Sequence, residues 1–458
     1  MKLKFDFTAM TDNVIGGQGV SASDLAKDRG FIKGAFDKTI NDNAAWRELP
    51  FDEKLTDEVE SFCAPIRKKA EAVVVFGIGG SALGIKAAGW SLLHLNHNSL
   101  KKHRRGAPKI YVDDNVDPER LTALLEVINI KKTYFNFITK SGETAETLSQ
   151  FLVVYDLLKR ALGKKKAKEH VIVTTTMESG SLYDVAVKEG FKIFGIPKDV
   201  GGRFSVLSAV GLVPLSIVGL DITMLLKGGA EMDEACNRED IFKNPALMAA
   251  YMHVKSMRAG KNISVIMPYA DSLKFMADFY AQLWGESLGK AMDLDGNRVN
   301  VGQTPVKALG VTDQHSQLQL YTEGPFDKIV TFLAVEEFRD GVIIPDDTGI
   351  SDFVYLKGHT FTQLMEAERK ATACALAKAG RANYTVTLPC VCEYTVGALL
   401  TYFMYQTAFA GAMLNVNTYD QPGVEEGKRS AYAILGRNGY ENSCMDLTRF
   451  GDDFIIDE

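Results

Sequence analysis

Apolar runs and amphipathic stretches alternate along most of the first half of the chain. The runs are long enough for strands and carry no charged residue in their centres, which is typical of strands buried in a parallel sheet. They lie at 72–76, 109–114, 134–138, 170–176 and 191–195. The stretches between them have helical spacing, and Pro118 after Asp117 marks one helix start. The pattern predicts an α/β fold with helices on both faces of the sheet.

A second alternation begins near residue 240. Strands are predicted at 263–268, 329–335 and 385–388, and helices at 271–283, 360–379 and 395–414. Residues 20–70 predict helices, one of them capped by Ser21 or Ser23, and 205–218 predicts a helix that leads toward the second half. A chain of 458 residues suggests two or three domains.

Two strand–loop–helix turns have the composition of phosphate sites. The first loop, Gly77-x-Gly-Gly-Ser81, offers backbone amides at a helix start, where the helix dipole favours an anion. The second, 139–144, adds the hydroxyl groups of Thr139, Ser141 and Thr144 and the charge of Lys140. Both loops have structural alternatives, a plain glycine turn and a helix N-cap, and the first also fits the dinucleotide fingerprint.

Glu286 is the candidate general base. It follows a predicted helix and stands between Gly285 and Ser287. A carboxyl group partly removed from water at a helix end holds its proton more strongly, as proton abstraction from carbon requires. The alternative is an ordinary solvated glutamate, and only suitable partners make the catalytic interpretation the better one.

Three further residues are candidates for such partners. Arg203 follows two glycines, and its permanent charge can stabilise a developing oxyanion. His315 lies in a polar strip and can titrate near neutral pH, and Lys428 follows a Pro-Gly turn. Each also has a structural alternative: a surface arginine, a hydrogen-bonded histidine and a solvated lysine.

Charge and composition exclude several classes of protein. The net charge of -6 argues against a nucleic-acid surface, despite the basic clusters at 101–105 and 164–166. The sequence has no stretch that reads as a secretory signal and none approaching the ~20 apolar residues of a membrane helix. The six cysteines are scattered, as in a reduced cytoplasmic protein. The pair Cys390 and Cys392 lacks a zinc spacing, and we expect it in the core of a strand.

Taken together, these motifs resemble the glucose-6-phosphate isomerase (phosphoglucose isomerase) family in its shorter bacterial form. The resemblance covers about 70–430 and rests on six motifs in the family's order: Gly77-x-Gly-Gly-Ser81, Lys140-Ser-Gly-x-Thr144, Gly201-Gly-Arg-Phe-Ser205, Gly285-Glu-Ser-Leu-Gly-Lys290, Gln314-His315 and Gly423-Val-Glu-x-Gly-Lys428. Two positions depart from expectation, Glu143 in the phosphate loop and Trp284 near the base, and they bear on substrate preference.

The resemblance implies two sugar-isomerase (SIS-type) three-layer αβα domains with parallel sheets. The first would span 66–220, and the second 1–65 with 221–458, including N-terminal helices and a C-terminal helical arm. It implies a cytoplasmic homodimer of glycolysis and gluconeogenesis that interconverts glucose 6-phosphate and fructose 6-phosphate through a cis-enediolate, without cofactor or metal.

The family's site residues carry over onto matching positions of this sequence. Glu286 would be the base and Arg203 the group facing the enediolate oxygen. His315, contributed by the neighbouring subunit, and Lys428 would open the sugar ring. Substrate would be bound by Gly80, Ser81, Thr139, Lys140, Ser141, Thr144, Gln282 and Gln421.

Three other functions remain open from the sequence. A nicotinamide oxidoreductase would use the Gly77 loop and an acid about twenty residues later, but the acid that ends the second strand, Asp113, is much further on. A phosphosugar-binding regulator would bind without turnover. An isomerase acting on another sugar phosphate, such as mannose 6-phosphate, would share the same groups.

Overall fold

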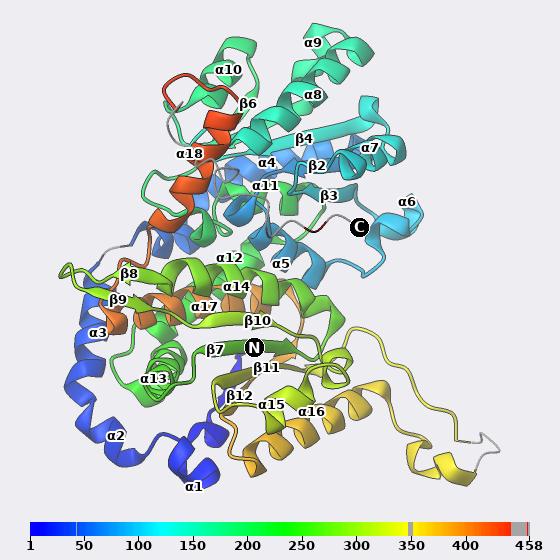
Figure 1. Cartoon of the computed structure of the whole chain (residues 1–458). Coiled ribbons are helices and arrows are strands. Elements are labelled where there is room, and N and C mark those ends of the chain that lie inside the picture. Colours follow the sequence, from blue (N-terminus) through cyan, green and yellow to red (C-terminus); the bar gives the residue numbers. More distant parts are fainter. Residues whose placement is uncertain (43, 347–350, 441–455, 457–458) are drawn as a thin grey trace. The chain divides into compact units, whose positions relative to one another are not determined.

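The computed structural model describes residues 1–42, 44–346, 351–440 and 456. The chain divides into two compact units, 1–418 and 419–458, and each is described by itself. The first unit contains two five-stranded sheets and a two-stranded hairpin (Figure 1).

The first sheet is entirely parallel, in the order β3-β2-β4-β5-β6. Its strands are β2 Ala72–Phe76, β3 Lys109–Asp113, β4 Thr133–Ile138, β5 Val171–Thr175 and β6 Lys192–Gly195. Every residue of β2, β4 and β5 is buried, as expected for strands covered on both faces. All five strands predicted from the apolar runs are confirmed to within one residue at each end.

Helices cover this sheet on both faces. The core on one face joins Phe76 and Phe137 of the sheet to Leu124, Phe151 and Leu182 of three helices, α7, α8 and α10. On the other face α11 contacts β2, α4 and α5. The helices of this part are α4 Glu53–Lys69, α5 Leu83–Leu92, α6 Lys102–Arg105, α7 Pro118–Val127, α8 Ala145–Leu162, α9 Lys164–Ala167, α10 Ser181–Glu189 and α11 Ala209–Ile217.

The second sheet has the order β1-β12-β11-β7-β10. Its strands are β1 Lys4–Asp6, β7 Ile263–Pro268, β10 Thr304–Lys307, β11 Lys328–Glu337 and β12 Asn383–Cys390. Four strands are parallel, and the edge strand β1 runs antiparallel to β12. The strands β1 and β10 were not predicted from the sequence, because these edge strands are short and lack a continuous apolar run. A separate hairpin joins β8 Lys290–Met292 to β9 Arg298–Val301.

Helices also enclose the second sheet. One face packs on α15 and α16 through Tyr321 and Leu376, and α14 contacts β7 and β10. The long helix α17 is buried almost throughout and packs against α12, α13 and α14, which explains its nearly uniform apolar character. The helices are α1 Asp12–Ile15, α2 Ala22–Lys27, α3 Arg29–Asn41, α12 Ile222–Cys236, α13 Pro245–Arg258, α14 Lys274–Leu288, α15 Leu318–Glu323, α16 Phe361–Lys378 and α17 Glu393–Leu414.

Among the described residues, no helix combines the length and apolar character needed to cross a membrane. Ser21 caps α2 in a capping box with Asp24, as its sequence position predicted. The second unit contains a short 3-10 helix, Pro422–Val424, followed by α18 Glu425–Ile434. The α/β architecture is confirmed, and the division at 66 and 220 stays a prediction.

Two local expectations were wrong. The helix predicted to end at residue 283 continues to Leu288, so Glu286 lies in its last turn and not after its end. Gly285 does not stop the helix, because hydrogen bonding continues through it to Gly289. Cys390 ends β12 half-buried and Cys392 is the N-cap of α17, so neither lies in the core of a strand. Cys444 lies outside the described residues.

Candidate active site

The last turns of α14 present Glu286 and Gln282 on the same side of the helix. Residues four apart on a helix are neighbours, and Gln282 Nε2 donates to Glu286 Oε1 at 3.1 Å. Lys290 Nζ donates to the Glu286 carbonyl oxygen at 2.6 Å, which satisfies a backbone acceptor at the helix end. The Glu286 side chain is 34% exposed, so it is fixed in position and still open to a ligand.

Arg203 meets Glu286 from a separate segment, the 3-10 helix Gly202–Phe204. Its side chain is only 2% exposed, and its Nη1 lies 3.2 Å from Glu286 Oε2. Its Nε donates to Ser287 Oγ at 2.7 Å and its Nη2 to the Thr418 carbonyl oxygen at 2.6 Å. The guanidinium therefore has a fixed plane and faces the carboxylate.

The glycine loop after β2 lies directly against these groups. A Cβ on Gly80 would stand 2.2 Å from the Gly202 carbonyl carbon, so the two backbones touch. Gly79 has φ +56, and a Cβ there would stand 2.8 Å from Gln282 Nε2. Ser81 closes the short 3-10 helix Gly79–Ser81. These contacts bring a predicted phosphate-type loop beside Arg203 and Gln282.

The second loop forms a cluster of hydroxyl groups before α8. Thr139 Oγ1 lies 2.7 Å from Thr144 Oγ1 and 3.4 Å from Ser141 Oγ. Thr144 is the N-cap of α8, yet its side chain makes no capping hydrogen bond, which weakens the plain N-cap alternative for this residue. Burial lowers the pKa of the Lys140 ammonium group, and nearby Asp199 offsets part of that effect.

The two loops open at the same edge of the first sheet. They follow β2 and β4, which are adjacent and parallel, with Phe76 opposite Phe137. The carboxyl ends of parallel strands are where ligands bind in open α/β sheets. The arrangement of glycines, hydroxyl groups and a helix N-terminus is suited to a phosphoryl group.

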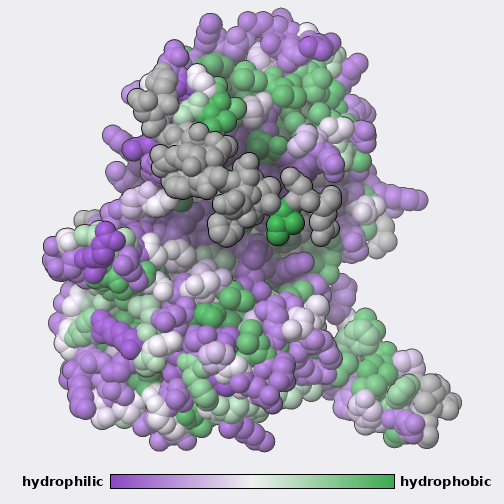
Figure 2. All heavy atoms as spheres, viewed as in Figure 1, coloured by the Kyte–Doolittle hydropathy of each residue, from purple (hydrophilic) through white to green (hydrophobic). Residues whose placement is uncertain are grey.

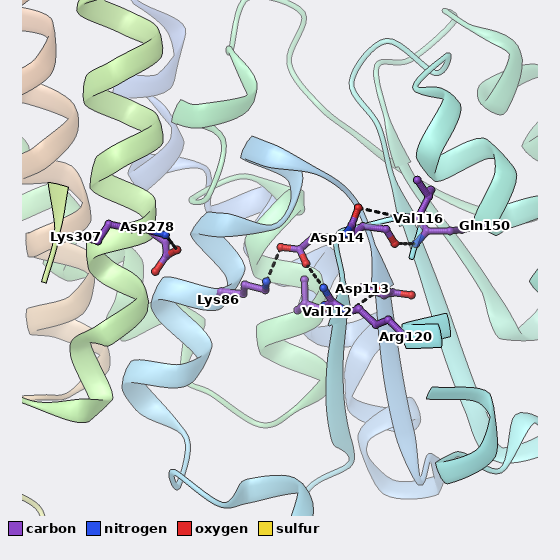
Figure 3. Close-up of polar contacts among 10 residues, drawn as sticks. Lys86, Val112, Asp113, Asp114, Val116, Arg120, Gln150, Asp278 and Lys307 are labelled. Atoms are coloured by element: carbon purple, nitrogen blue, oxygen red, sulfur yellow. Dashed lines mark hydrogen bonds and ion pairs between the residues drawn. The ribbon is translucent and has the colours of Figure 1, made fainter. Parts of the chain in front are cut away.

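Asp113 occupies the position that a dinucleotide-binding protein would use for a ribose. It ends β3 beside β2, but it is only 2% exposed and Arg120 Nε lies 3.0 Å from its Oδ1. Arg120 also pairs with Asp114 at 2.9 Å, and Asp114 pairs with Lys86 of α5 at 2.5 Å (Figure 3). Burial raises the pKa of the Asp113 carboxyl group. This carboxylate is enclosed and paired, which disfavours the nicotinamide alternative.

Comparison with known proteins gives a consistent result. The phosphoglucose isomerase family model matches residues 53–448. The chain belongs to the phosphoglucose isomerase family. It is 53% identical over 403 residues to a glucose-6-phosphate isomerase of Carboxydothermus hydrogenoformans, covering 88% of this chain and 87% of that one. It is 40% identical over 383 residues to a glucose-6-phosphate isomerase of Thermus thermophilus, covering 84% and 88%.

Solved structures of similar proteins share the fold. A hypothetical protein of Thermus thermophilus superposes with a TM-score of 0.85 at 35% identity, covering 95% of this chain and all of that one. A glucose-6-phosphate isomerase from Chlamydia trachomatis gives a TM-score of 0.73 at 22% identity, covering 90% and 84%. Membership of the phosphoglucose isomerase family thus agrees with the α/β fold described above.

For three described residues predicted for the site, His315, Gln421 and Lys428, the structure gives no contact with Glu286. His315 follows the 3-10 helix Thr312–Gln314 and is exposed, and its ring has no hydrogen-bond partner among the described residues. Gln421 and Lys428 belong to the second unit, where Lys428 Nζ pairs with Glu425 at 2.8 Å. Their part in this family's chemistry therefore stays a prediction.

Some residues that shape the site were missed from the sequence. In the sequence Ser287 is simply the residue after Glu286, yet its hydroxyl orients Arg203. The Thr418 carbonyl could not have been found, because any residue type can supply a backbone oxygen. Asp199 gave no signal either, because it is in a turn between β6 and the Arg203 segment. Within the described residues, no three His, Cys, Asp or Glu side chains gather as metal ligands.

Proposed function

We propose that this chain interconverts glucose 6-phosphate and fructose 6-phosphate. One observation carries the proposal: Glu286 and Arg203 lie 3.2 Å apart, beside the glycine loop after β2. The relatives named above as glucose-6-phosphate isomerases support the choice of substrate. The same groups suit the chemistry, because a sugar phosphate needs an anion site, a base and a countercharge.

Glu286 acts as the base. Its carboxylate takes the proton from C2 of the open-chain aldose, the C2–H electron pair forms the C1=C2 double bond, and the C1 carbonyl oxygen becomes the enediolate oxygen. One proton then passes from the C2 hydroxyl to O1, and Glu286 returns its proton to C1 as the C2 carbonyl of the ketose forms. As the proton reaches Glu286, negative charge moves from the carboxylate to the enediolate oxygen. The Arg203 guanidinium, held by Ser287 and Thr418, faces that charge in both states, so little reorganisation is needed.

The phosphoryl group is bound at a distance from the reacting carbons. We assign it to the loops after β2 and β4, through Ser81, Thr139, Lys140, Ser141 and Thr144. Binding energy from this remote group orients C1 and C2 at the base. Gly80, Gln282 and Gln421 complete the substrate contacts, and His315 with Lys428 shuttles the proton that opens the sugar ring.

The active enzyme is a homodimer in which His315 comes from the neighbouring subunit. The exposed ring of His315 supports this assignment, because its own chain places no partner beside it among the described residues. An extension between β11 and α16 carries further apolar residues, with Ile343 69% and Tyr355 72% exposed (Figures 1 and 2). Apolar side chains grouped on an extension are typical of a surface covered by another subunit.

We place the enzyme in the cytoplasm, within glycolysis and gluconeogenesis. The scattered cysteines support a reducing compartment, since the five described ones are free. The net charge of -6 does not favour nucleic acid as a partner.

A coupled assay of fructose 6-phosphate conversion to glucose 6-phosphate, run with a chelator, tests the proposed activity. We expect turnover in the range typical of metabolic enzymes, about 1–1,000 per second. Binding of the sugar phosphate without turnover would favour a regulator instead. Turnover of mannose 6-phosphate with higher kcat/KM than glucose 6-phosphate would favour the other isomerase.

Subunit mixing tests the position of His315. Glu286→Gln and His315→Ala are prepared separately and then combined by co-refolding. If His315 crosses the interface, each mixed dimer has one intact site, and about a quarter of the wild-type activity returns. If both residues serve the same chain's site, no mixed dimer has an intact site and activity stays absent.

A further inference from the structure

Two sulfur atoms lie close together near the paired strands β1 and β12, which are the first and last strands of the second sheet along the chain. Cys390 is the last residue of β12, and its thiol donates to the Met1 thioether with Sγ and Sδ 3.8 Å apart. The antiparallel register pairs Lys4 with Thr387. Continued by three residues, it sets Met1 opposite Cys390, so the sulfur contact follows from the pairing of the strands.

A third sulfur lies two residues further along. Cys392 is the N-cap of α17, with extended backbone at φ -142 and ψ 170, so its side chain points to the same side as that of Cys390. Residues two apart on extended backbone share a face, so the two thiols lie on one side of the chain, and Cys392 Sγ lies 3.6 Å from Thr395 Oγ1 at the start of α17. Both cysteines are half-buried and so within reach of a small solute.

We propose that Cys390, Cys392 and Met1 form a binding site for a soft monovalent metal ion, Cu(I). Thiolate and thioether sulfurs are soft ligands, and they bind the soft ion Cu(I) in preference to harder cations. Glu337 pairs with Cys390 in the β11–β12 ladder and is exposed, which adds negative charge nearby. On binding, two thiols release their protons to water, two Cu–thiolate bonds and one Cu–thioether bond form, and the oxidation state does not change.

The site does not suit zinc. A structural zinc ion takes four nitrogen, sulfur or carboxylate ligands in a tetrahedron, and thioethers are not among them. Cys390 and Cys392 supply two such ligands, and the described residues place no third His, Cys, Asp or Glu in a common ligand group with them. Two thiolates and one thioether match the low coordination number and softness of Cu(I) better.

The other cysteines provide internal controls. Cys63 and Cys236 are fully buried, and Cys374 is exposed on α16, apart from the pair. None of the three sulfur ligands belongs to the active-site residues described above. Cys390→Ser and Cys392→Ser should therefore leave isomerase turnover unchanged, which makes turnover a measure of correct folding.

Transfer of Cu(I) from its coloured bicinchoninate complex to the reduced full-length protein tests the proposal under anaerobic conditions. We expect the wild type and Cys374→Ser to remove one Cu(I) per chain. Loss of either proposed thiol should weaken binding by at least about 100-fold, because even outer partners of metal sites are worth roughly 10–100-fold. Uptake that is absent in the wild type, or equal in all four proteins, would overturn the proposal.

Two measurements on the wild type keep the test independent of how the variants fold. Alkylation with mass-spectrometric readout should show Cu(I) protecting Cys390 and Cys392 and leaving Cys374 reactive. Cu(I) should also slow amide exchange in β1, since the metal would tie Met1 to β12 next to the three paired residues of that strand. Protection of Cys374 alone, or unchanged exchange in β1 with one Cu(I) bound, would contradict the assignment.

Discussion

Replacing Arg203 by lysine keeps the charge and removes the fixed guanidinium plane. Three of its nitrogens have separate partners: Ser287 Oγ at 2.7 Å, the Thr418 carbonyl oxygen at 2.6 Å and Glu286 Oε2 at 3.2 Å. A lysine side chain is shorter and ends in a compact ammonium group. It cannot bind three partners that are arranged around a planar guanidinium. Arg203→Lys therefore tests whether geometry, beyond charge, matters in this site.

The expected loss can be worked out from these contacts. The Ser287 hydroxyl is completely buried, and the Arg203 side chain is 2% exposed. Each buried polar group left without its partner costs about 1–3 kcal/mol of folding stability. Removing one positioned donor from an oxyanion costs roughly 100- to 1,000-fold in kcat. Two groups, the Ser287 hydroxyl and the Thr418 carbonyl, lose their partner, so we expect Arg203→Lys to lower kcat by that factor and the unfolding free energy by about 2–6 kcal/mol.

The coupled assay gives kcat and KM separately, and thermal unfolding gives stability. We expect kcat and kcat/KM to fall together with little change in KM, because the lost interaction strengthens only in the transition state. Ser287→Ala is the matched control: it removes one hydroxyl that orients Arg203 and should cost about tenfold in kcat. A kcat for Arg203→Lys within threefold of wild type would refute the proposed role of the guanidinium plane.

Two further predictions concern the buried side chain of His253 and the backbone of Gly80 in the glycine loop. Full burial lowers the pKa of His253 from 6.5 to about 4, although a hydrogen bond to Gln303 opposes the effect. Below pH 6.5 the unfolded chain protonates His253 while the folded chain does not. The contribution of His253 to the unfolding free energy is therefore fully present above pH 6.5, and about 3 kcal/mol is lost as the pH drops toward 4. Denaturant unfolding across that range should show a flatter pH dependence in His253→Gln; identical profiles would exclude His253 as the source. Gly80→Ala places a methyl group 2.2 Å from the Gly202 carbonyl carbon, so the Arg203 segment must shift. We expect kcat to fall at least about tenfold, since misplacement by 1 Å can cost 100-fold. Gly34→Ala in α3, with open space around its Cβ, is the matched control.

The strands could be predicted because their signal is local. Buried parallel strands read as apolar runs, so all five strands of the first sheet were found, as was β7 to the residue. The strand β1 was missed because its residues alternate Lys4, Phe5 and Asp6 and only the pairing with β12 fixes them. The end of helix α14 was predicted too early because glycine usually weakens a helix, whereas the structure continues α14 past Gly285 to Leu288, with Lys290 bonded to its last turn.

The site was predictable in residue type more than in arrangement. The motifs identified Glu286 and Arg203, the family resemblance added Gln282, and the structure brings these three together. The contacts that orient them come from Ser287 and from a backbone carbonyl 215 positions after Arg203, and these depend on tertiary structure alone. A group supplied by another subunit, as we propose for His315, shows in the chain's own fold only as an exposed side chain.

The central claim is that the Glu286 carboxylate moves the proton between C2 and C1, and Glu286→Gln tests it most directly. The amide keeps the size and can still lie beside Gln282 and Arg203, but it cannot take a proton from carbon. The account predicts turnover lower by several orders of magnitude, with fructose 6-phosphate binding, measured by calorimetry, nearly unchanged. Turnover within about tenfold of wild type would contradict the account.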